Sequence, residues 1–393
     1  MKKAKIISIL LVTVLFFQYC SKSDQSITPT YEAVKAAFGN KIDLNNLSNY
    51  ANQSKPTYIT KENTGSNAIT NAKATLGRVL FYDKNLSIDN TVSCGSCHKQ
   101  EFAFGDIESP SKGVSGGLPG RHSMRLVNAR FAIENKFFWD ERASSLEQQT
   151  TMPIQDHAEM GFSGKDGRPN MSELIKKMEG IGYYKELFQF VYGNSSISES
   201  KMQECLAQFV RSIQSFDSKY DAGRSAVAND NQPFPNFTAQ ENQGKNLFIA
   251  PPNFDASGVR IGGGIGCNGC HNAPEFDINP NSGNNGIIGV LNGAGIDINN
   301  IRAPSLRDLA GPSGNPNTPM MHTGGITTLK SVIGHYGKIN LAPGNTRLDP
   351  KLRPNGFGQQ LNLNQTEVDA VVAFMKTLTG VNVYTDGKWS SPF

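Results

Sequence analysis

The sequence predicts a mainly α-helical protein made of two similar helical units. Apolar residues recur at helical spacing in several stretches, and no alternating strand pattern of any length appears. The lead-in Gly-basic-x-Leu-Phe occurs at 77–81 and again at 244–248, each time ahead of a Cys-x-x-Cys-His motif. A repeated lead-in and motif indicate a duplicated domain type, and 393 residues give room for two domains of ordinary size.

The two lead-ins are expected to end helices. Residues 74–81 form the first, and residues 241–248 form the second. Thr238 is followed three residues later by Glu241, which predicts a capping box at the start of the second helix.

Three further helices follow from apolar spacing. Ser172 is expected to cap a short helix that follows it. Residues 200–216 form another, with Cys205 on its apolar face as a buried thiol and not as a ligand. The last helix covers 365–379, where Gly380 is a natural stop.

The chain opens with a segment typical of an export signal. Three lysines precede an apolar run at 6–17, which is too short to span a bilayer comfortably. Cys20 follows, so residues 1–20 resemble a bacterial lipoprotein signal in which the cysteine is lipidated. Ordinary secretion with cleavage nearby is the alternative. Either way we expect an exported protein, periplasmic or associated with the outer membrane.

Composition and turn content suggest the remaining boundaries. Residues 21–66 are polar and weakly patterned, so they are interpreted as a tether and lead-in. The polar stretch at 221–235 separates an N-terminal domain, 67–230, from a C-terminal domain, 231–393. The formal net charge is +4 and includes three leader lysines, which gives no support for nucleic-acid binding.

Two Cys-x-x-Cys-His motifs, at 94–98 and 267–271, are the signature of c-type haem attachment. Two thiols add to the vinyl groups of one porphyrin, and the adjacent imidazole reaches the iron as its proximal ligand. Zinc knuckles and disulfides are the alternatives, but a disulfide within either pair leaves its histidine without a role. The sequence therefore predicts two covalently bound haem c groups, held by Cys94, Cys97, His98, Cys267, Cys270 and His271.

Further motifs accompany the haem motifs in order along the chain. They are Leu76–Phe81, Leu126–Asn128, Phe138–Ala143, Gln149, Pro153, Glu159–Met160, Ala303–Arg307, His322–Gly325 and Thr328–Leu329. Together they resemble the bacterial dihaem cytochrome c peroxidases and their MauG-type relatives, over most of the chain. The resemblance implies two cytochrome c-like helical haem domains, and it implies that Arg307 binds cofactor.

The resemblance also implies different tasks for the two haems. In that family the N-terminal haem reacts with peroxide, and the C-terminal haem receives electrons and passes them across. His98 and His271 would be the proximal iron ligands. Glu159 matches the distal catalytic glutamate, Gln149 the distal glutamine and Trp139 the tryptophan between the haems.

Elementary chemistry agrees with these roles. Cleaving hydrogen peroxide needs a base that takes a proton from one oxygen and returns it to the other. A carboxyl group such as Glu159 acquires a raised pKa in an apolar haem pocket and suits this task. An amide such as Gln149 orients peroxide, and the indole of Trp139 offers an electron path. Without the resemblance, these three residues would be interpreted as surface or core residues.

Two positions depart from the family pattern near the first haem. Val114 stands where typical peroxidases carry a histidine that ligates the resting haem, so we expect a five-coordinate first haem. His122 is the alternative distal ligand. His122 also replaces an asparagine of a calcium site between the haems, which puts calcium in doubt, although carbonyls around Asn317 and Pro319 remain available.

A third departure concerns the sixth ligand of the second haem. Typical peroxidases use a methionine at the position of Tyr336, and MauG-type enzymes carry tyrosine there. An oxyanion ligand stabilises ferric and higher states and lowers the potential. Met320, Met321 and His335 are the alternative ligands.

The leading functional prediction is an exported peroxidase that reduces hydrogen peroxide at the N-terminal haem. Electrons arrive from a small c-type cytochrome or a cupredoxin and pass through the C-terminal haem. The alternatives are a MauG-type oxidase acting on a protein or organic substrate, and an electron-transfer cytochrome without catalysis. The resemblance leaves a homodimer open, and Cys20 predicts a membrane partner through its lipid.

Overall fold

The computed structural model describes residues 30–133, 135–278, 282–291 and 293–393. The expected signal at 1–20, with Cys20, lies outside these residues. The described part is mainly helical, as predicted, with only four short strands. None of its helices combines the length and the apolar character needed to cross a membrane.

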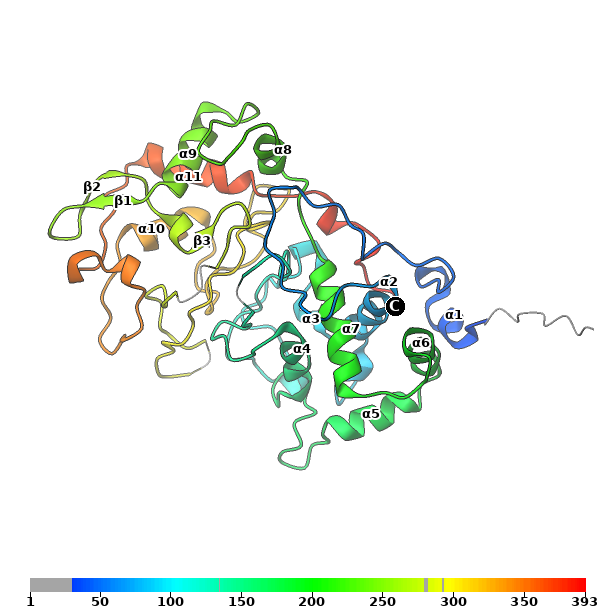
Figure 1. Cartoon of the computed structure of the whole chain (residues 1–393). Coiled ribbons are helices and arrows are strands. Elements are labelled where there is room, and N and C mark those ends of the chain that lie inside the picture. The colour runs from blue at the N-terminus through cyan, green and yellow to red at the C-terminus, as the bar shows by residue number, and fades with distance from the viewer. Residues whose placement is uncertain (1–29, 134, 279–281, 292) are drawn as a thin grey trace, which may run out of the picture.

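The N-terminal unit is built around two helices that cross closely, α2 and α7 (Figure 1). A Cβ atom at Gly77 would lie 2.0 Å from the carbonyl oxygen of Cys205, so the crossing requires glycine on α2. Cys205 itself is fully buried, as predicted. The helices of this unit are α1 (Glu32–Phe38), α2 (Asn71–Tyr82), α3 (Cys94–Cys97), α4 (Leu146–Gln155), α5 (Met171–Glu179), α6 (Gly182–Tyr192) and α7 (Glu199–Ser212).

The C-terminal unit repeats this crossing with α9 and α11. A Cβ atom at Gly244 would lie 1.9 Å from the carbonyl oxygen of Ala370. The antiparallel pair β1 with β2 precedes the second Cys-x-x-Cys-His motif, and the pair β3 with β4 begins at its His271. The elements are α8 (Lys219–Ser225), α9 (Ala239–Ile249), β1 (Pro252–Phe254), β2 (Arg260–Gly263), β3 (His271–Asn272), β4 (Asp277–Ile278), α10 (Leu329–Gly337) and α11 (Gln365–Lys376).

The repeated Gly-basic-x-Leu-Phe lead-in therefore has a packing explanation. Its glycine lets a second helix cross, and its basic residue is buried and donates to backbone carbonyls. Arg78 Nε donates to the Ser390 carbonyl at 2.7 Å, and Lys245 Nζ donates to the Gln232 carbonyl at 2.9 Å. Each unit thus uses the lead-in to fix one helix pair and one distant loop.

The predicted helix ends are partly confirmed. Thr238 and Glu241 form the expected capping box of α9. The prediction for Ser172 was wrong, because Asn170 caps α5 and Ser172 already lies inside the first turn. Helix α7 ends at Ser212, before the predicted residue 216, because the Asn128 side chain bonds both the N–H and the carbonyl of Ser215.

Short 3-10 turns connect these helices. They are η1 (Gly39–Lys41), η2 (Lys84–Leu86), η3 (Gln100–Phe102), η4 (Val114–Gly116), η5 (Cys267–Gly269), η6 (Pro350–Leu352), η7 (Pro354–Gly356) and η8 (Asn382–Tyr384). Of these, η4 and η5 lie beside the two cavities described below.

The two hydrophobic cores divide the chain differently from the expected boundary at residue 230. Before the chain enters the second unit, the last residue in the first core is Ile213, and the second core begins at Tyr220. The C-terminal tail then returns to the first core, where Trp389 is buried and its indole lies 3.2 Å from Ser212 Oγ. In Figure 1 the C-terminus accordingly lies beside α2.

The described part of the expected tether, residues 30–66, is packed. Phe38 and Tyr50 belong to the first core, and Ile59 is fully buried. Tyr50 Oη also donates to the Lys388 carbonyl at 2.6 Å in the returning tail. After α1 and η1 the segment has no further helix, and its buried apolar residues contact tertiary partners one at a time, which a local sequence pattern does not reveal.

Candidate functional site

A cavity of about 850 Å³ opens beside the first Cys-x-x-Cys-His motif. Cys94, Cys97 and His98 all line it. A capping box between Ser93 and Ser96 starts the short helix α3 and sets both thiols one turn apart. This arrangement suits two thioether bonds to one flat cofactor.

His98 is prepared for metal ligation by its hydrogen bond. Its Nδ1 lies 3.0 Å from the carbonyl oxygen of Phe104, and a carbonyl only accepts, so Nδ1 carries the proton. Burial lowers the pKa of His98, which favours the neutral ring. The Nε2 lone pair is then free for a metal.

A second cavity, of about 500 Å³, is lined by Cys267, Cys270 and His271. Burial lowers the pKa of His271 to about 4, against the opposite effect of the nearby Pro304 and Phe276 carbonyls. Its Nδ1 is buried and makes no hydrogen bond with the described residues. A neutral, buried imidazole beside two thiols fits the same kind of cofactor as the first cavity.

Glu159 lines the first cavity, as the sequence led us to expect of a distal carboxyl group. Its pKa is raised to about 7, mainly by burial and also by the neighbouring Asp156 carboxylate, while Arg142 opposes this. Asp156 Oδ1 accepts the backbone N–H groups of Ala158 and Glu159, at 2.8 and 3.1 Å. The turn after α4 is therefore held so that it presents a carboxyl group with a near-neutral pKa.

The loop that contains Val114 packs against this turn. The Val114 N–H donates to the Glu159 carbonyl at 2.9 Å, and the Val114 side chain is buried. A Cβ atom at Gly113 would lie 1.9 Å from the Ala158 carbonyl oxygen, so the approach requires glycine. Among the described residues that line the first cavity, Gly113 is present and Val114 is not.

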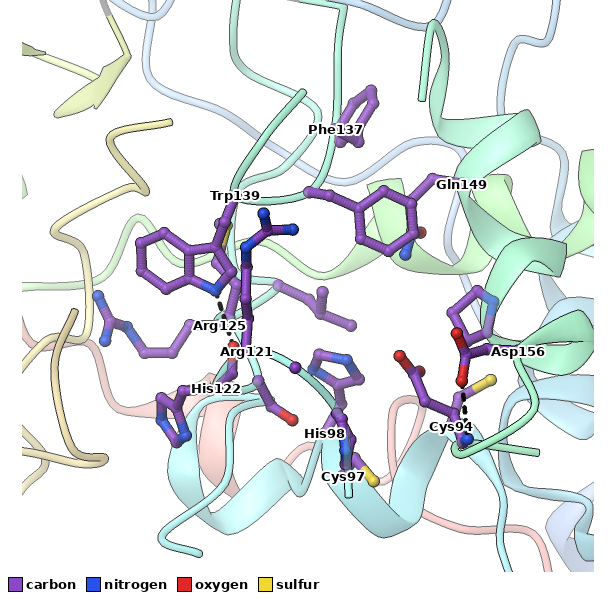
Figure 2. A pocket seen from close by; sticks show the side chains of 18 of the residues that line it. Cys94, Cys97, His98, Arg121, His122, Arg125, Phe137, Trp139, Gln149 and Asp156 are labelled. Atoms are coloured by element: carbon purple, nitrogen blue, oxygen red, sulfur yellow. Dashed lines mark hydrogen bonds between the residues drawn. The ribbon is translucent and has the colours of Figure 1, made fainter. Parts of the chain in front are cut away.

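Gln149 joins Glu159 in the first cavity from the middle of α4. Figure 2 shows Gln149 and Asp156 on one side of His98 and Trp139 and His122 on the other, in that view. The structure thus brings the carboxyl and amide groups into the cavity of the first motif.

Trp139 lies in a wall that the two cavities share. It lines both, its indole N–H donates to the His122 carbonyl at 2.7 Å, and its ring centroid is 6.3 Å from that of His322. The position agrees with the expectation of an indole between the two cofactor sites. The wall residues common to both cavities are His122, Ser123, Met124, Arg125, Trp139, Arg302 and Pro304.

His122 is buried in this wall, and neither ring nitrogen has a hydrogen bond among the described residues. Burial lowers its pKa to about 4, so the ring is neutral at physiological pH. Its backbone N–H donates to the His322 carbonyl at 2.7 Å, which ties the two units together.

Tyr336 lines the second cavity from α10, together with Met320 and Met321. The Asn285 amide donates to Tyr336 Oη at 3.3 Å and to Met321 Sδ at 3.1 Å, so both candidate ligands share one donor. His335 is not among the described lining residues, and its Nε2 bonds the Asn285 carbonyl at 2.8 Å. The geometry therefore favours Tyr336 and the methionines over His335.

Arg307 does not line either cavity among the described residues. Its fully buried guanidinium lies 2.9 Å from an Asp221 carboxylate oxygen and donates to the Pro274 carbonyl at 2.9 Å. Arg307 thus braces the loop after His271. Its role in cofactor binding stays a prediction.

Sequence reasoning missed several residues of the shared wall. Arg125 and Arg302 line both cavities, and Arg121 lines the first. Asn285, which contacts Tyr336, was missed as well. The local signals were weak: Arg121 and Arg125 flank His122, and Arg302 directly precedes the family-like stretch Ala303–Arg307.

Comparison with known proteins agrees with this site. Residues 71–228 match the family model described as di-haem cytochrome c peroxidase. The methylamine utilization protein MauG of Methylophilus methylotrophus is 26% identical over 323 residues, covering 80% of this chain and 84% of that protein. The cytochrome c551 peroxidase of Nitrosomonas europaea is 26% identical, covering 78% and 80% of the two chains.

A solved structure gives the same answer for the fold. A MauG-like protein associated with microbial copper homeostasis superposes with a TM-score of 0.67 at 26% identity, covering 87% of this chain and 99% of that one. Two cavities, each beside a Cys-x-x-Cys-His motif, are what a dihaem protein needs. Residues 71–228 therefore match the di-haem cytochrome c peroxidase family, and most of the chain is similar to oxidoreductases named as dihaem peroxidases and MauG proteins.

Proposed function

We propose that this protein is an exported peroxidase that reduces hydrogen peroxide in the first cavity, with electrons relayed through the second. The donor in this proposal is a reduced small c-type cytochrome or a cupredoxin. One observation carries the proposal: Glu159, a buried carboxyl group with a pKa raised to about 7, lines the same cavity as His98.

The residues of both cavities fit covalently attached haem c. Cys94 and Cys97 would hold one group, and the thiols of the second motif would hold the other. His98 and His271 would be the proximal ligands, since both rings are buried and neutral. When bound, haem supplies the redox-active iron that peroxide reduction requires.

Glu159 handles the protons in this reaction. Hydrogen peroxide, two electrons and two protons give two water molecules, and breaking the O–O bond requires protonation of the leaving oxygen. A carboxyl group with a pKa of about 7 accepts and returns a proton at neutral pH. The Gln149 amide, which makes no side-chain hydrogen bond among the described residues, is available to orient peroxide.

Exchange of Glu159 for Gln tests the proposal. The amide keeps the size of the side chain but cannot take a proton, so peroxide turnover with a reduced donor should fall about 100-fold or more. Haem content serves as the control and should stay at two per chain. Unchanged turnover would favour another base or a cytochrome that only transfers electrons.

A MauG-type oxidase is the second candidate, and two positions favour it. Tyr336 lines the second cavity, and an oxyanion ligand there would make a poor acceptor from an ordinary cytochrome donor. Val114 stands where typical peroxidases carry a histidine ligand, so a haem bound in the first cavity would lack that ligand. Peroxide titration with and without a reduced small cytochrome separates the candidates: a peroxidase turns over with the donor, and a MauG-type oxidase does not.

Export and anchoring complete the proposal. We expect the mature protein to begin at a lipidated Cys20 and to lie in the periplasm or at the outer membrane. Metabolic labelling with a fatty acid, compared between the natural chain and a C20A variant, tests the anchor. Label in both chains, or in neither, would contradict it.

A further inference from the structure

Three arginines stand in or beside the wall that separates the cavities, and they differ in their partners. Arg121 binds the carboxylates of Asp140 and Asp297, at 2.8 and 2.6 Å. Arg302 lies 3.4 Å from Asp277. The third, Arg125, forms no ion pair within the described part of the chain, so its charge has no carboxylate beside it.

The Arg125 guanidinium reaches only neutral oxygens. It donates to the Ser305 carbonyl at 3.0 Å and to Thr318 Oγ1 at 3.4 Å, while its Nε is buried and has no hydrogen bond to any described residue. Burial lowers the pKa of Arg125 to about 10, opposed by the more distant Asp308 and Tyr384, so the group remains protonated at neutral pH. A buried cation without a counter-ion is unfavourable unless an anion joins it.

The side chain is held in place at this point. Gly105 leaves room for it, because a Cβ atom there would lie 3.0 Å from Arg125 Cγ and 2.7 Å from a Thr318 methyl carbon. Arg125 lines both cavities, so it stands beside whatever occupies either. The anions that haem would bring are its propionate carboxylates, and a guanidinium binds carboxylates through paired donors.

The position of Arg125 also matters for the calcium ion that the family resemblance suggests between the haems. Family resemblance placed a calcium site here, with an asparagine at the position of His122 and carbonyls around residues 317–319. In this chain His122 offers ring nitrogens, which calcium does not prefer, and Arg125 donates to Thr318 inside that segment. A fixed positive charge therefore stands beside the segment whose carbonyls a calcium ion would use.

We propose that Arg125 is a built-in cation between the two haem sites, which binds haem propionates and takes the place of a divalent metal ion. The proposal rests on the presence of two haems and not on peroxide chemistry. A nearby cation disfavours the ferric state, so Arg125 raises the reduction potential of a haem that it contacts.

Redox titration of the purified dihaem protein tests this proposal. R125Q should lower the midpoint potential of at least one haem, and R125K, which keeps the charge, should stay near the natural protein. R130Q is the matched control, because Arg130 is paired with Glu62 and is not among the described lining residues. Unchanged potentials in an R125Q protein that retains both haems would overturn the proposal.

Two further measurements keep the test decisive. If R125Q cannot be isolated with both haems, the R125K variant is the test. Two haems per chain with the midpoint potentials of the natural protein would support a role for the charge. Loss of haem in R125K as well would refute that role. The natural protein should also show the same potentials and optical spectra in calcium chloride and in EGTA. A shift between these two conditions would mean that a calcium ion, and not Arg125, is the cation of the wall.

Discussion

Asp156 Oδ1 accepts the backbone N–H of Glu159 at 3.1 Å. The Asp156 carboxylate therefore shapes the turn that carries Glu159, and its charge also raises the pKa of the Glu159 carboxyl group. The two effects can be separated. Asparagine keeps an oxygen that accepts the hydrogen bond but removes the charge, whereas alanine removes both.

We predict that D156N moves the pH dependence of peroxide turnover to lower pH. In the natural protein Glu159 is protonated below about pH 7 and ionised above it, so activity that needs the base rises through this range. Without the Asp156 charge the pKa falls, although burial still holds it above the ordinary value, and the rise should shift by about one unit or less. D156A should instead lower the rate at every pH. An unshifted profile in D156N would show that burial alone sets the pKa.

The chain contains two tryptophans, which allows a matched pair of variants. Trp139 lines both cavities, whereas Trp389 lies in the first core and bonds Ser212. We expect W139F to slow electron transfer between the haems, measured by stopped-flow reduction of the first haem through the second. W389F should leave that rate unchanged even if it lowers the melting temperature. Equal rates in W139F and the natural protein would exclude the indole as the path.

The ligand of the second haem can be assigned by spectroscopy. Y336F removes the phenol oxygen, so the optical and EPR spectra of the oxidised second haem should change to a different spin or ligand state. H335Q should leave the spectra as they are, because His335 bonds the Asn285 carbonyl and is not among the described lining residues. If Y336F has the natural spectrum, Met320 or Met321 becomes the ligand to test.

The helix crossings predict where an added methyl group is not tolerated. G77A and G244A each drive a Cβ atom to within 2.0 Å of a backbone carbonyl oxygen, so we expect losses of about 1–3 kcal/mol or failure to fold. G334A is the control, since Gly334 lies in α10 with nothing within 4 Å and should gain about 0.5–1 kcal/mol. Thermal unfolding of the three variants measures the difference. Similar melting temperatures for G77A and G334A would contradict the crossing geometry.

Features that depend on short stretches of chain were predictable from sequence. The Cys-x-x-Cys-His motifs, the capping box of Thr238 and the helix from Gln365 each require only neighbours within a few residues. Predictions failed where a distant group intervened. Asn128 ends α7 early by bonding Ser215, and the tail from residue 383 leaves the second unit for the first core.

The sequence by itself determined that there are two Cys-x-x-Cys-His units, and it predicted that His98 and His271 serve two haems and that Glu159 and Gln149 act beside the first. Only the tertiary structure decided that Arg125, in the wall between the cavities, has no ion-pair partner among the described residues, and that Arg307 is already paired with Asp221. The physical reason is that the local sequence around an arginine is the same whether or not the fold places a carboxylate next to its side chain. The partner of an arginine comes from a segment far away in the chain, and whether that partner is present sets the charge balance of the site.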